Sequence, residues 1–128
     1  MRFVKLIPGA LAGILTYLFG EWSPMLTMLV TVVVTDYVTG VIAAAVTHSL
    51  SSKRGFVGII KKFLIFTVVA LSAAFDKLVP ATHDSVKAVV CMFYIANESL
   101  SVIENVGETG LPLPKALIKM VEKLKDAE

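Results

Sequence analysis

The sequence predicts an all-α integral membrane protein with three to four transmembrane helices, four being preferred, and a short amphipathic C-terminal helix. Hydrophobic residues make up 56% of the 128 residues and charged residues only 17%. Four apolar stretches alternate with polar connectors, and the C-terminal tail spaces its lysines as one face of a helix would. A soluble chain of this length cannot hide so much apolar surface from water, whereas a bilayer covers it with lipid.

The four apolar stretches form an expected transmembrane domain at 1–110. They cover about residues 6–20, 25–47, 59–75 and 86–104. A helix needs ~20 residues to cross ~30 Å of hydrocarbon, which the second stretch provides and the first does not. The first stretch therefore either spans by thinning the bilayer or lies in the interface. Although residues 31–35 are β-branched, an isolated strand leaves backbone groups unpaired in lipid, so a helix is expected.

The basic residues predict the orientation of the chain. If four helices cross, one side of the membrane holds ten of the twelve: Arg2, Lys5, Lys53, Arg54, Lys61, Lys62, Lys115, Lys119, Lys123 and Lys125. The other side holds only Lys77 and Lys87. Because cytoplasmic connectors collect Lys and Arg, both termini and a basic loop at 53–62 are expected in the cytoplasm. A three-span chain, with the first stretch lying flat, splits this positive charge and is less favoured.

The segment 111–128 is expected to form a basic amphipathic cytoplasmic tail. Four helix-breaking residues precede or open it: Gly107, Gly110, Pro112 and Pro114. At 100° per residue, one face of the following helix carries Leu117, Met120, Val121 and Leu124, and the opposite face carries Lys115, Lys119 and Lys123. This pattern is typical of a helix lying on an anionic leaflet. The alternative is a tail that only keeps the chain soluble.

The second apolar stretch contains one ionisable residue, and two neighbours share its helix face: Asp36, Thr39 and Gly40. Gly40 and Ala44 form a small-xxx-small pair, which lets two helix backbones approach closely. One interpretation is an oligomer seam with a polar group at its centre. The other is an intramolecular partner for Asp36, such as Lys61 or Lys62.

The fourth stretch carries polar residues every three to four positions: Asn97, Glu98, Ser101, Glu104 and Asn105. Polar groups at membrane depth face protein, a partner or water, so this stripe is interpreted as facing a watery lumen or another subunit. Before assembly, Asn97, Glu98 and Ser101 are expected to be hidden between helices. A helix end that emerges into water would explain Glu104 and Asn105, but it explains Asn97 poorly.

Several classes of function are excluded by what the sequence lacks. It has no Ser/His/Asp set, no glycine-rich phosphate loop and no HExxH motif, so an enzyme is not expected. Cys91 stands alone, and His48 and His83 have no other ligand types beside them, so no metal or cofactor is expected. A net charge of +2, without a basic run, gives no reason to expect nucleic acid as a partner.

Two blocks of sequence resemble those of the phage lysis and toxin-secretion holins of Gram-positive bacteria and their phages. The first block is DYVTG at 36–40 with Ala43 and Ala44, then LSSKRG at 50–55, Gly58 and the Lys61–Lys62 pair. The second is NESLSVIEN at 97–105, followed by GLPLP at 110–114. Together with the hydrophobic layout, the resemblance covers the chain from about Pro24 to Lys115.

The resemblance implies a homo-oligomer in the cytoplasmic membrane of a bacterial host. Such holins accumulate there and then assemble into lesions that release an endolysin, which is a cell-wall hydrolase, or a toxin, without necessary direct contact. Host cell lysis follows. The candidates for lining the oligomer or lesion are Asp36, Thr39, Gly40, Asn97, Glu98, Ser101, Glu104 and Asn105.

Two other classes remain open at this point. A small four-helix proton-coupled transporter would use Asp36 or Glu98 as its coupling carboxylate, but it leaves the cationic loop and the amphipathic tail unexplained. A membrane scaffold subunit would only support a larger complex. Leakage of large solutes separates the three classes, because only a holin releases them.

Overall fold

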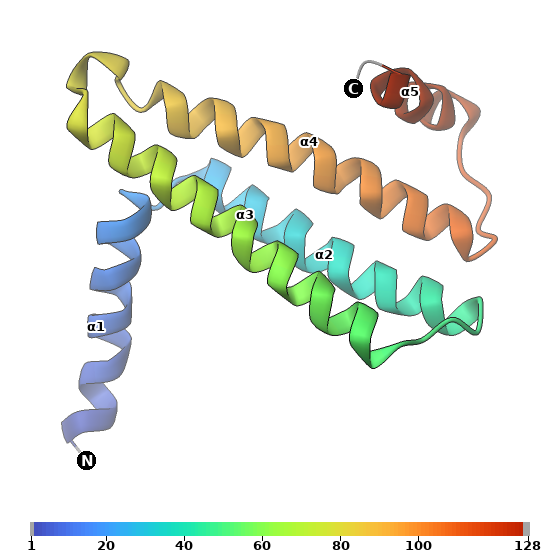
Figure 1. Cartoon of the computed structure of the whole chain (residues 1–128), viewed down its shortest axis with the longest axis horizontal. Helices are drawn as coiled ribbons and strands as arrows, with labels where there is room; N and C mark the ends of the chain where they lie inside the picture. The colour runs from blue at the N-terminus through green and yellow to red at the C-terminus, as the bar shows by residue number, and fades with distance from the viewer. Residues whose placement is uncertain (1, 127–128) are drawn as a thin grey trace.

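The computed structural model describes residues 2–126, with the side chains of residues 4–123 and 126. All the regular elements in this part of the chain are helices, as predicted (Figure 1). The elements are α1 (Arg2–Phe19), α2 (Pro24–Val46), α3 (Ser52–Leu78), the 3₁₀ turn η1 (Pro80–Thr82), α4 (Ser85–Glu108) and α5 (Lys115–Asp126). Residues 127–128 of the predicted tail, and the side chains of Arg2, Leu124 and Lys125, lie outside the described residues.

Three of these helices, α2, α3 and α4, are long and apolar enough to cross a membrane. The 23 residues of α2 correspond to roughly 35 Å at 1.5 Å per residue, which exceeds the hydrocarbon thickness. The apolar part of α1, Val4–Phe19, is shorter. The chain is therefore a multi-pass protein with three candidate spans, and the fourth span remains a prediction.

The third helix begins earlier than the hydrophobic pattern predicted. It starts at Ser52 rather than near residue 59, because the Ser51 side chain caps it by accepting a hydrogen bond from the Arg54 backbone N–H at 3.3 Å. The prediction that residues 53–62 form a basic loop is therefore wrong. Lys53, Arg54, Lys61 and Lys62 belong to the first three turns of α3, and only residues 47–51 connect it to α2.

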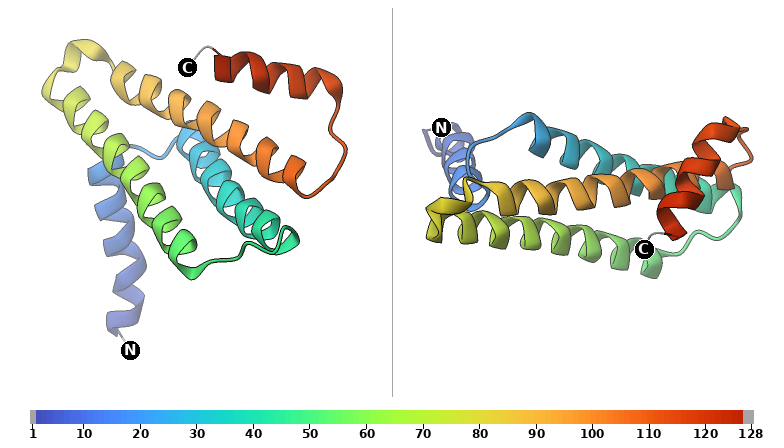
Figure 2. Two further views of the ribbon diagram at one scale, coloured as in Figure 1. Left: turned by 45° about the vertical axis from the view of Figure 1, so that its right-hand side comes forward. Right: turned by 90° about the horizontal axis from the view of Figure 1, so that it is seen from above.

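The bundle is closed at one end by an apolar core. Helix α4 runs alongside both α2 and α3, which meet each other over only a short stretch (Figures 1 and 2). The core residues are Leu26, Leu29 and Val33 of α2, Ile65 and Val69 of α3, and Cys91 of α4. They lie in the first halves of α2 and α4 and in the middle of α3. At the opposite end, polar residues replace this packing.

Helix α1 leans away from the bundle and is tied to it at one end only (Figure 1). Its last turn is held by two lysines, because Lys77 Nζ donates to the Tyr17 carbonyl and Lys87 Nζ to the Phe19 carbonyl at 2.8 Å. The Phe19 ring also meets Phe66 of α3 edge to face, with centroids 6.2 Å apart. The remaining turns of α1 are exposed over most of their surface. This arrangement suits a helix packed mainly against lipid.

The fold also shows that the charge pattern favours four spans less strongly than the sequence suggested. Because α2, α3 and α4 alternate in direction, the α2–α3 connector and α5 lie at the same end of the bundle whether or not α1 spans (Figure 2). Only Arg2 and Lys5 change sides between the two arrangements. The end that carries α5 is the more basic in both, so the positive-inside rule assigns it to the cytoplasm in both.

Cysteine labelling in intact cells distinguishes the two topologies. In a Cys91→Ala background, a cysteine at Ser52 is expected to resist a membrane-impermeant thiol reagent, because the positive-inside rule predicts that this end faces the cytoplasm. A cysteine at Lys5 is expected to be protected as well if α1 spans, and to be labelled if α1 lies on the outer surface. Labelling at Ser52 from outside would contradict both arrangements.

Asp76 joins the α3–α4 hairpin, and its replacement is expected to loosen it. Its buried carboxylate accepts hydrogen bonds from Thr82 Oγ1 at 2.6 Å, from Val86 N at 3.3 Å and from Lys87 N at 2.8 Å. Because these backbone donors open α4, Asp76→Ala leaves them unpaired and is expected to lower the melting temperature in detergent by several degrees. Asp84→Asn is the matched control, since the Asp84 side chain caps nothing. Equal melting of the two variants would show that the hairpin does not depend on Asp76.

Candidate functional site

Three charged side chains from three different helices meet inside the bundle, and we call this group the ion cluster: Asp36 of α2, Lys62 of α3 and Glu98 of α4. Lys62 Nζ donates to Asp36 Oδ2 and, at 2.5 Å, to Glu98 Oε2. Asp36 and Glu98 are only 7% and 5% exposed. One ammonium therefore serves two buried carboxylates at a depth where lipid surrounds the protein.

Asn105 extends the ion cluster along α4. Its Nδ2 donates to Asp36 Oδ1 at 2.9 Å, to the Asp36 carbonyl at 3.1 Å and to Thr39 Oγ1 at 3.0 Å. Gly40 lies beside it, and a Cβ at that position would stand 3.5 Å from Asn105 Nδ2. That distance is an ordinary van der Waals contact, so Gly40 packs beside the amide without being required for its approach to α2.

The ion cluster holds the three helices in one register. Charges taken into apolar surroundings are costly unless they are paired and hydrogen-bonded. Among the side chains that the structure describes, none has a buried nitrogen or oxygen without a hydrogen-bond partner. Two carboxylates and one ammonium leave the ion cluster formally negative by one charge, so it is balanced less completely than a simple ion pair.

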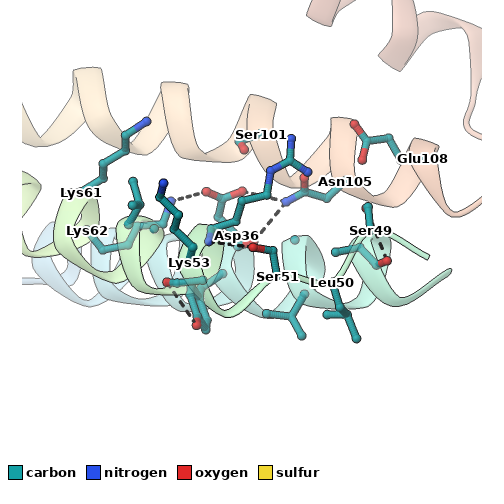
Figure 3. Close-up of a pocket in the computed structure, with 18 residues that line it drawn as sticks. Asp36, Ser49, Leu50, Ser51, Lys53, Lys61, Lys62, Ser101, Asn105 and Glu108 are labelled. Carbon is teal, nitrogen blue, oxygen red and sulfur yellow. Dashed lines mark hydrogen bonds and ion pairs between the residues drawn. The ribbon is translucent and has the colours of Figure 1, made fainter. Parts of the chain in front are cut away.

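A cavity of about 530 Å³ opens from the ion cluster toward the end of the bundle where α3 begins. Asp36, Lys62, Ser101 and Asn105 line it, with Lys53 from the first turn of α3 and Glu108 from the end of α4, and Lys61 lies beside Lys62 (Figure 3). Here α3 has separated from α4, so the apolar packing of the other end does not continue. Polar groups of the ion cluster are therefore reachable from one end of the protein.

Tyr37 keeps α2 and the first turns of α3 together beside the cavity. Its hydroxyl donates to the Gly55 carbonyl at 3.5 Å. A Cβ on Gly55 or Gly58 would stand 3.4 Å or 3.6 Å from the tyrosine side chain. Both distances are ordinary van der Waals contacts, so the tyrosine side chain packs directly against these two glycines of α3.

The structure brings most of the predicted site residues together within one chain. Asp36, Glu98, Ser101 and Asn105 lie at the ion cluster or the cavity, with Thr39 and Gly40 beside them. Of the two alternatives for Asp36, the described chain contains the intramolecular one, and its partner is Lys62 rather than Lys61. Whether the same residues line an oligomer remains a prediction.

Asn97 does not lie in the ion cluster. The expectation that it is hidden between helices is wrong, because Asn97 is exposed. Cys91, Glu98 and Asn105 follow each other at seven-residue spacing and face inward, so Asn97, one residue before Glu98, is rotated about 100° away. Glu104 is half-buried. The seven-residue spacing of Cys91, Glu98 and Asn105 is visible in the sequence and distinguishes the inward-facing Glu98 from Asn97.

Lys62 was foreseen as a possible partner for Asp36, but its second ion pair, with Glu98, was not predicted. The structure makes Lys62 the link between α2 and α4. The signal available in the sequence was its depth, because it lies farther into the third helix than Lys53 and Arg54. No group of three or more His, Cys, Asp or Glu side chains that could hold a metal ion occurs among the described residues.

Comparison with known proteins identifies the family. The profile described as the bacteriophage holin family matches residues 13–126, which is most of the chain. The chain belongs to this holin family. Its members are non-enzymatic membrane proteins, in agreement with the prediction that the chain is not an enzyme.

Relatives of this holin family member occur in bacteria and in a phage. A protein named probable holin from Bacillus phage phi105 is 38% identical over 101 residues, covering 79% of this chain and 73% of its own. An uncharacterized protein of Halalkalibacterium halodurans is 39% identical, covering 98% of this chain and 96% of its own. Another from Listeria monocytogenes is 39% identical, covering 94% and 84%. No solved structure matches the chain.

Removing the central ammonium is expected to destabilise the protein far more than removing its neighbour. Lys62→Met leaves two buried carboxylates without a cation, a change that costs about 3–5 kcal/mol for buried pairs. Lys61→Met is the matched control, because Lys61 is exposed and forms no ion pair within the described residues. We expect Lys62→Met to accumulate poorly and to melt early in detergent, and Lys61→Met to melt close to wild type in detergent without added lipid.

A second variant distinguishes the loss of charge balance from a general loss of folding. Combining Lys62→Met with Asp36→Asn and Glu98→Gln removes all three charges, so part of the lost stability is expected to return. Equal melting temperatures for Lys62→Met and Lys61→Met, or no recovery in the triple variant, would show that the ion cluster does not hold the helices together.

Proposed function

We propose that this chain acts as a holin: it oligomerises in the bacterial cytoplasmic membrane and forms lesions that release an endolysin or a toxin. Release of the hydrolase then causes lysis of the host cell. Family membership over residues 13–126 and the likeness to the phage protein named probable holin support the class of function. The observation that carries the mechanism is the ion cluster, because it hides three charges inside a single chain.

The closed chain is suited to accumulation in lipid. The outward faces of the three long helices are apolar and exposed, as at Val34 and Val38 of α2, Phe63 and Leu71 of α3, and Phe93 of α4. Since the charged groups point inward, each copy can remain in the membrane without a leak. Accumulation before lysis requires this property.

During assembly, the charged groups of the ion cluster leave one another and gain water as their new partner. Helix α3 meets α2 over only a short stretch, whereas Asn105 bonds α4 directly to α2. We infer that α3 separates from the α2–α4 pair. Asp36 and Glu98 would then face water in the lesion. Exposure of a carboxylate to lipid costs about 2.5 kcal/mol or more, so separation is favourable only where other copies and water replace the lipid.

The remaining candidate residues take their places in the same scheme. Thr39, Gly40, Ser101 and Asn105 lie along the α2–α4 contact and would line the lesion beside the two carboxylates. Glu104, which is half-buried on α4, would meet a neighbouring copy, whereas the exposed Asn97 takes no part in the lesion in this scheme. In the preferred four-span arrangement both termini are cytoplasmic, and the hydrolase passes through the lesion without a binding site on this chain.

Two assays test the proposed function. Induced expression with and without a muralytic enzyme, followed by culture turbidity, is expected to show rapid clearing only when both proteins are present. Reconstitution into liposomes that hold both small and large dyes is expected to release both. Leakage of protons alone would indicate a transporter that uses Asp36 or Glu98. An absence of leakage at high protein density would indicate a scaffold.

Glu98→Leu is expected to hold the chain in its closed form. The substitution leaves Lys62 and Asp36 as an ion pair without net charge. Such a pair is stable between helices, and its exposure to water in a lesion lowers the free energy less than exposure of the wild-type ion cluster. The variant should therefore accumulate and associate normally but fail to release a co-expressed hydrolase, and Glu98→Gln should be intermediate. Turbidity and a western blot of the membrane fraction provide the measurement.

Asn97→Leu is the matched control for this experiment. It alters the adjacent residue of the same helix, but its side chain is exposed and lies outside the ion cluster. We expect lysis close to the wild-type time. If Asn97→Leu blocked release and Glu98→Leu did not, the outer face of α4 would line the lesion, and the proposed exposure of the ion cluster would be wrong.

A further inference from the structure

The lining of the cavity carries more positive than negative charge. Its four basic residues are Lys53, Arg54, Lys61 and Lys62, and its two acidic residues are Asp36 and Glu108. Within the described residues, Lys62 forms two ion pairs, while the other three basic side chains form none and are exposed. Figure 3 shows Lys53 and Lys61 among the side chains that line the cavity, near Lys62. The cavity therefore presents unpaired cations at its mouth.

The wall of the same cavity is apolar. Val41 and Ala44 of α2, Leu50 of the connector and Val57 of α3 line it. Val41, Leu50 and Val57 are exposed. The cavity thus combines a cationic mouth with an apolar wall, and it opens at the end of the spans, where the headgroup region of a bilayer begins.

We propose that this cavity binds one anionic phospholipid, with its phosphate at Lys53, Arg54 and Lys61 and one acyl chain along the apolar wall. Basic pockets between transmembrane helices on the cytoplasmic side recognise such headgroups. The volume of about 530 Å³ is in the range of small-molecule sites. The positive-inside rule assigns this end to the cytoplasmic leaflet, so the lipid is drawn from that leaflet.

The charge of the cavity argues against other occupants. Helix α5 has lysines along its polar face, so like charges disfavour its entry into the cavity. A second copy of the chain would bring the same cations to the same place. A soluble phosphate would satisfy the mouth but leave the apolar wall uncovered. A phospholipid matches the mouth and the wall together.

The bound lipid also has a structural consequence for the ion cluster. It would fill the opening between α2 and the first turns of α3, on the side from which Asp36 and Lys62 can be reached. The lipid is thereby expected to stabilise the closed chain. This inference does not depend on lesion formation, because binding to the purified protein is measured without lysis.

Native mass spectrometry of the full-length protein in detergent tests the proposal. Phosphatidylglycerol, phosphatidylcholine, glycerol 1-phosphate and inorganic phosphate are added separately, and the retained ligand is counted. We expect one tightly retained phosphatidylglycerol per chain, little phosphatidylcholine, and no retention of the two soluble phosphates. Retention of the soluble phosphates with the same affinity would overturn the assignment to a lipid. A doubling of the protein mass in place of lipid retention would make the cavity an interface between copies.

Matched variants locate the bound lipid. Lys53→Gln with Arg54→Gln removes two cations from the mouth of the cavity. The double variant is expected to weaken phosphatidylglycerol binding by roughly 30-fold, since each basic residue near an anionic headgroup contributes roughly fivefold to the affinity. Lys119→Gln with Lys123→Gln removes the same charge from α5, where the side chains are exposed and no cavity is involved. This control is expected to keep the retained lipid. Equal losses in the two double variants would show diffuse attraction and would overturn the site.

A third variant tests the apolar wall without changing the charge. Ala44→Phe places a large side chain in the cavity, and it is expected to reduce retention while circular dichroism shows unchanged helix content. Normal retention by the folded variant would show that no acyl chain lies along this wall.

Discussion

The ammonium of Lys62 is shared by two carboxylates that come from different helices, in a part of the bundle that lipid surrounds. Each of these groups is too costly to expose to hydrocarbon, so each depends on the other two. The position of α3 relative to α2 and α4 follows from this dependence, as does the direction of the cavity that opens beside it. An apolar bundle without the ion cluster would have no comparable reason to prefer one register.

The two ends of the bundle differ because the ion cluster divides them. On one side Leu29, Val69 and Cys91 pack closely, and Asp76 closes the α3–α4 hairpin. On the other side α3 diverges, and its lysines and arginine line an open cavity. A closed apolar end and an open basic end suit a protein that is stable in the membrane and whose α3 can still separate from the α2–α4 pair. The proposed lipid occupies the open end, where its binding would oppose the separation of α3.

Much of the fold could be predicted from composition and periodicity. The helical class, the three long spans and the amphipathic α5 follow from runs of apolar residues and from the spacing of lysines, which are local properties. The start of α3 could not be predicted in this way, because basic residues at 53–62 resemble a loop until the Ser51 cap is considered. The short α1 shows the same limit, since its length alone does not decide between spanning and lying flat.

For the candidate site, the sequence by itself determined which polar residues lie at membrane depth and the family that they resemble. Asp36, Glu98 and Asn105 were recognisable because each interrupts an apolar stretch. Only the tertiary structure decided which of them meet, since Lys62 and Glu98 are 36 residues apart and no local pattern links them. The inward face of α4 was likewise set by packing against α2 and α3, which turned Glu98 toward Lys62 and left Asn97 exposed.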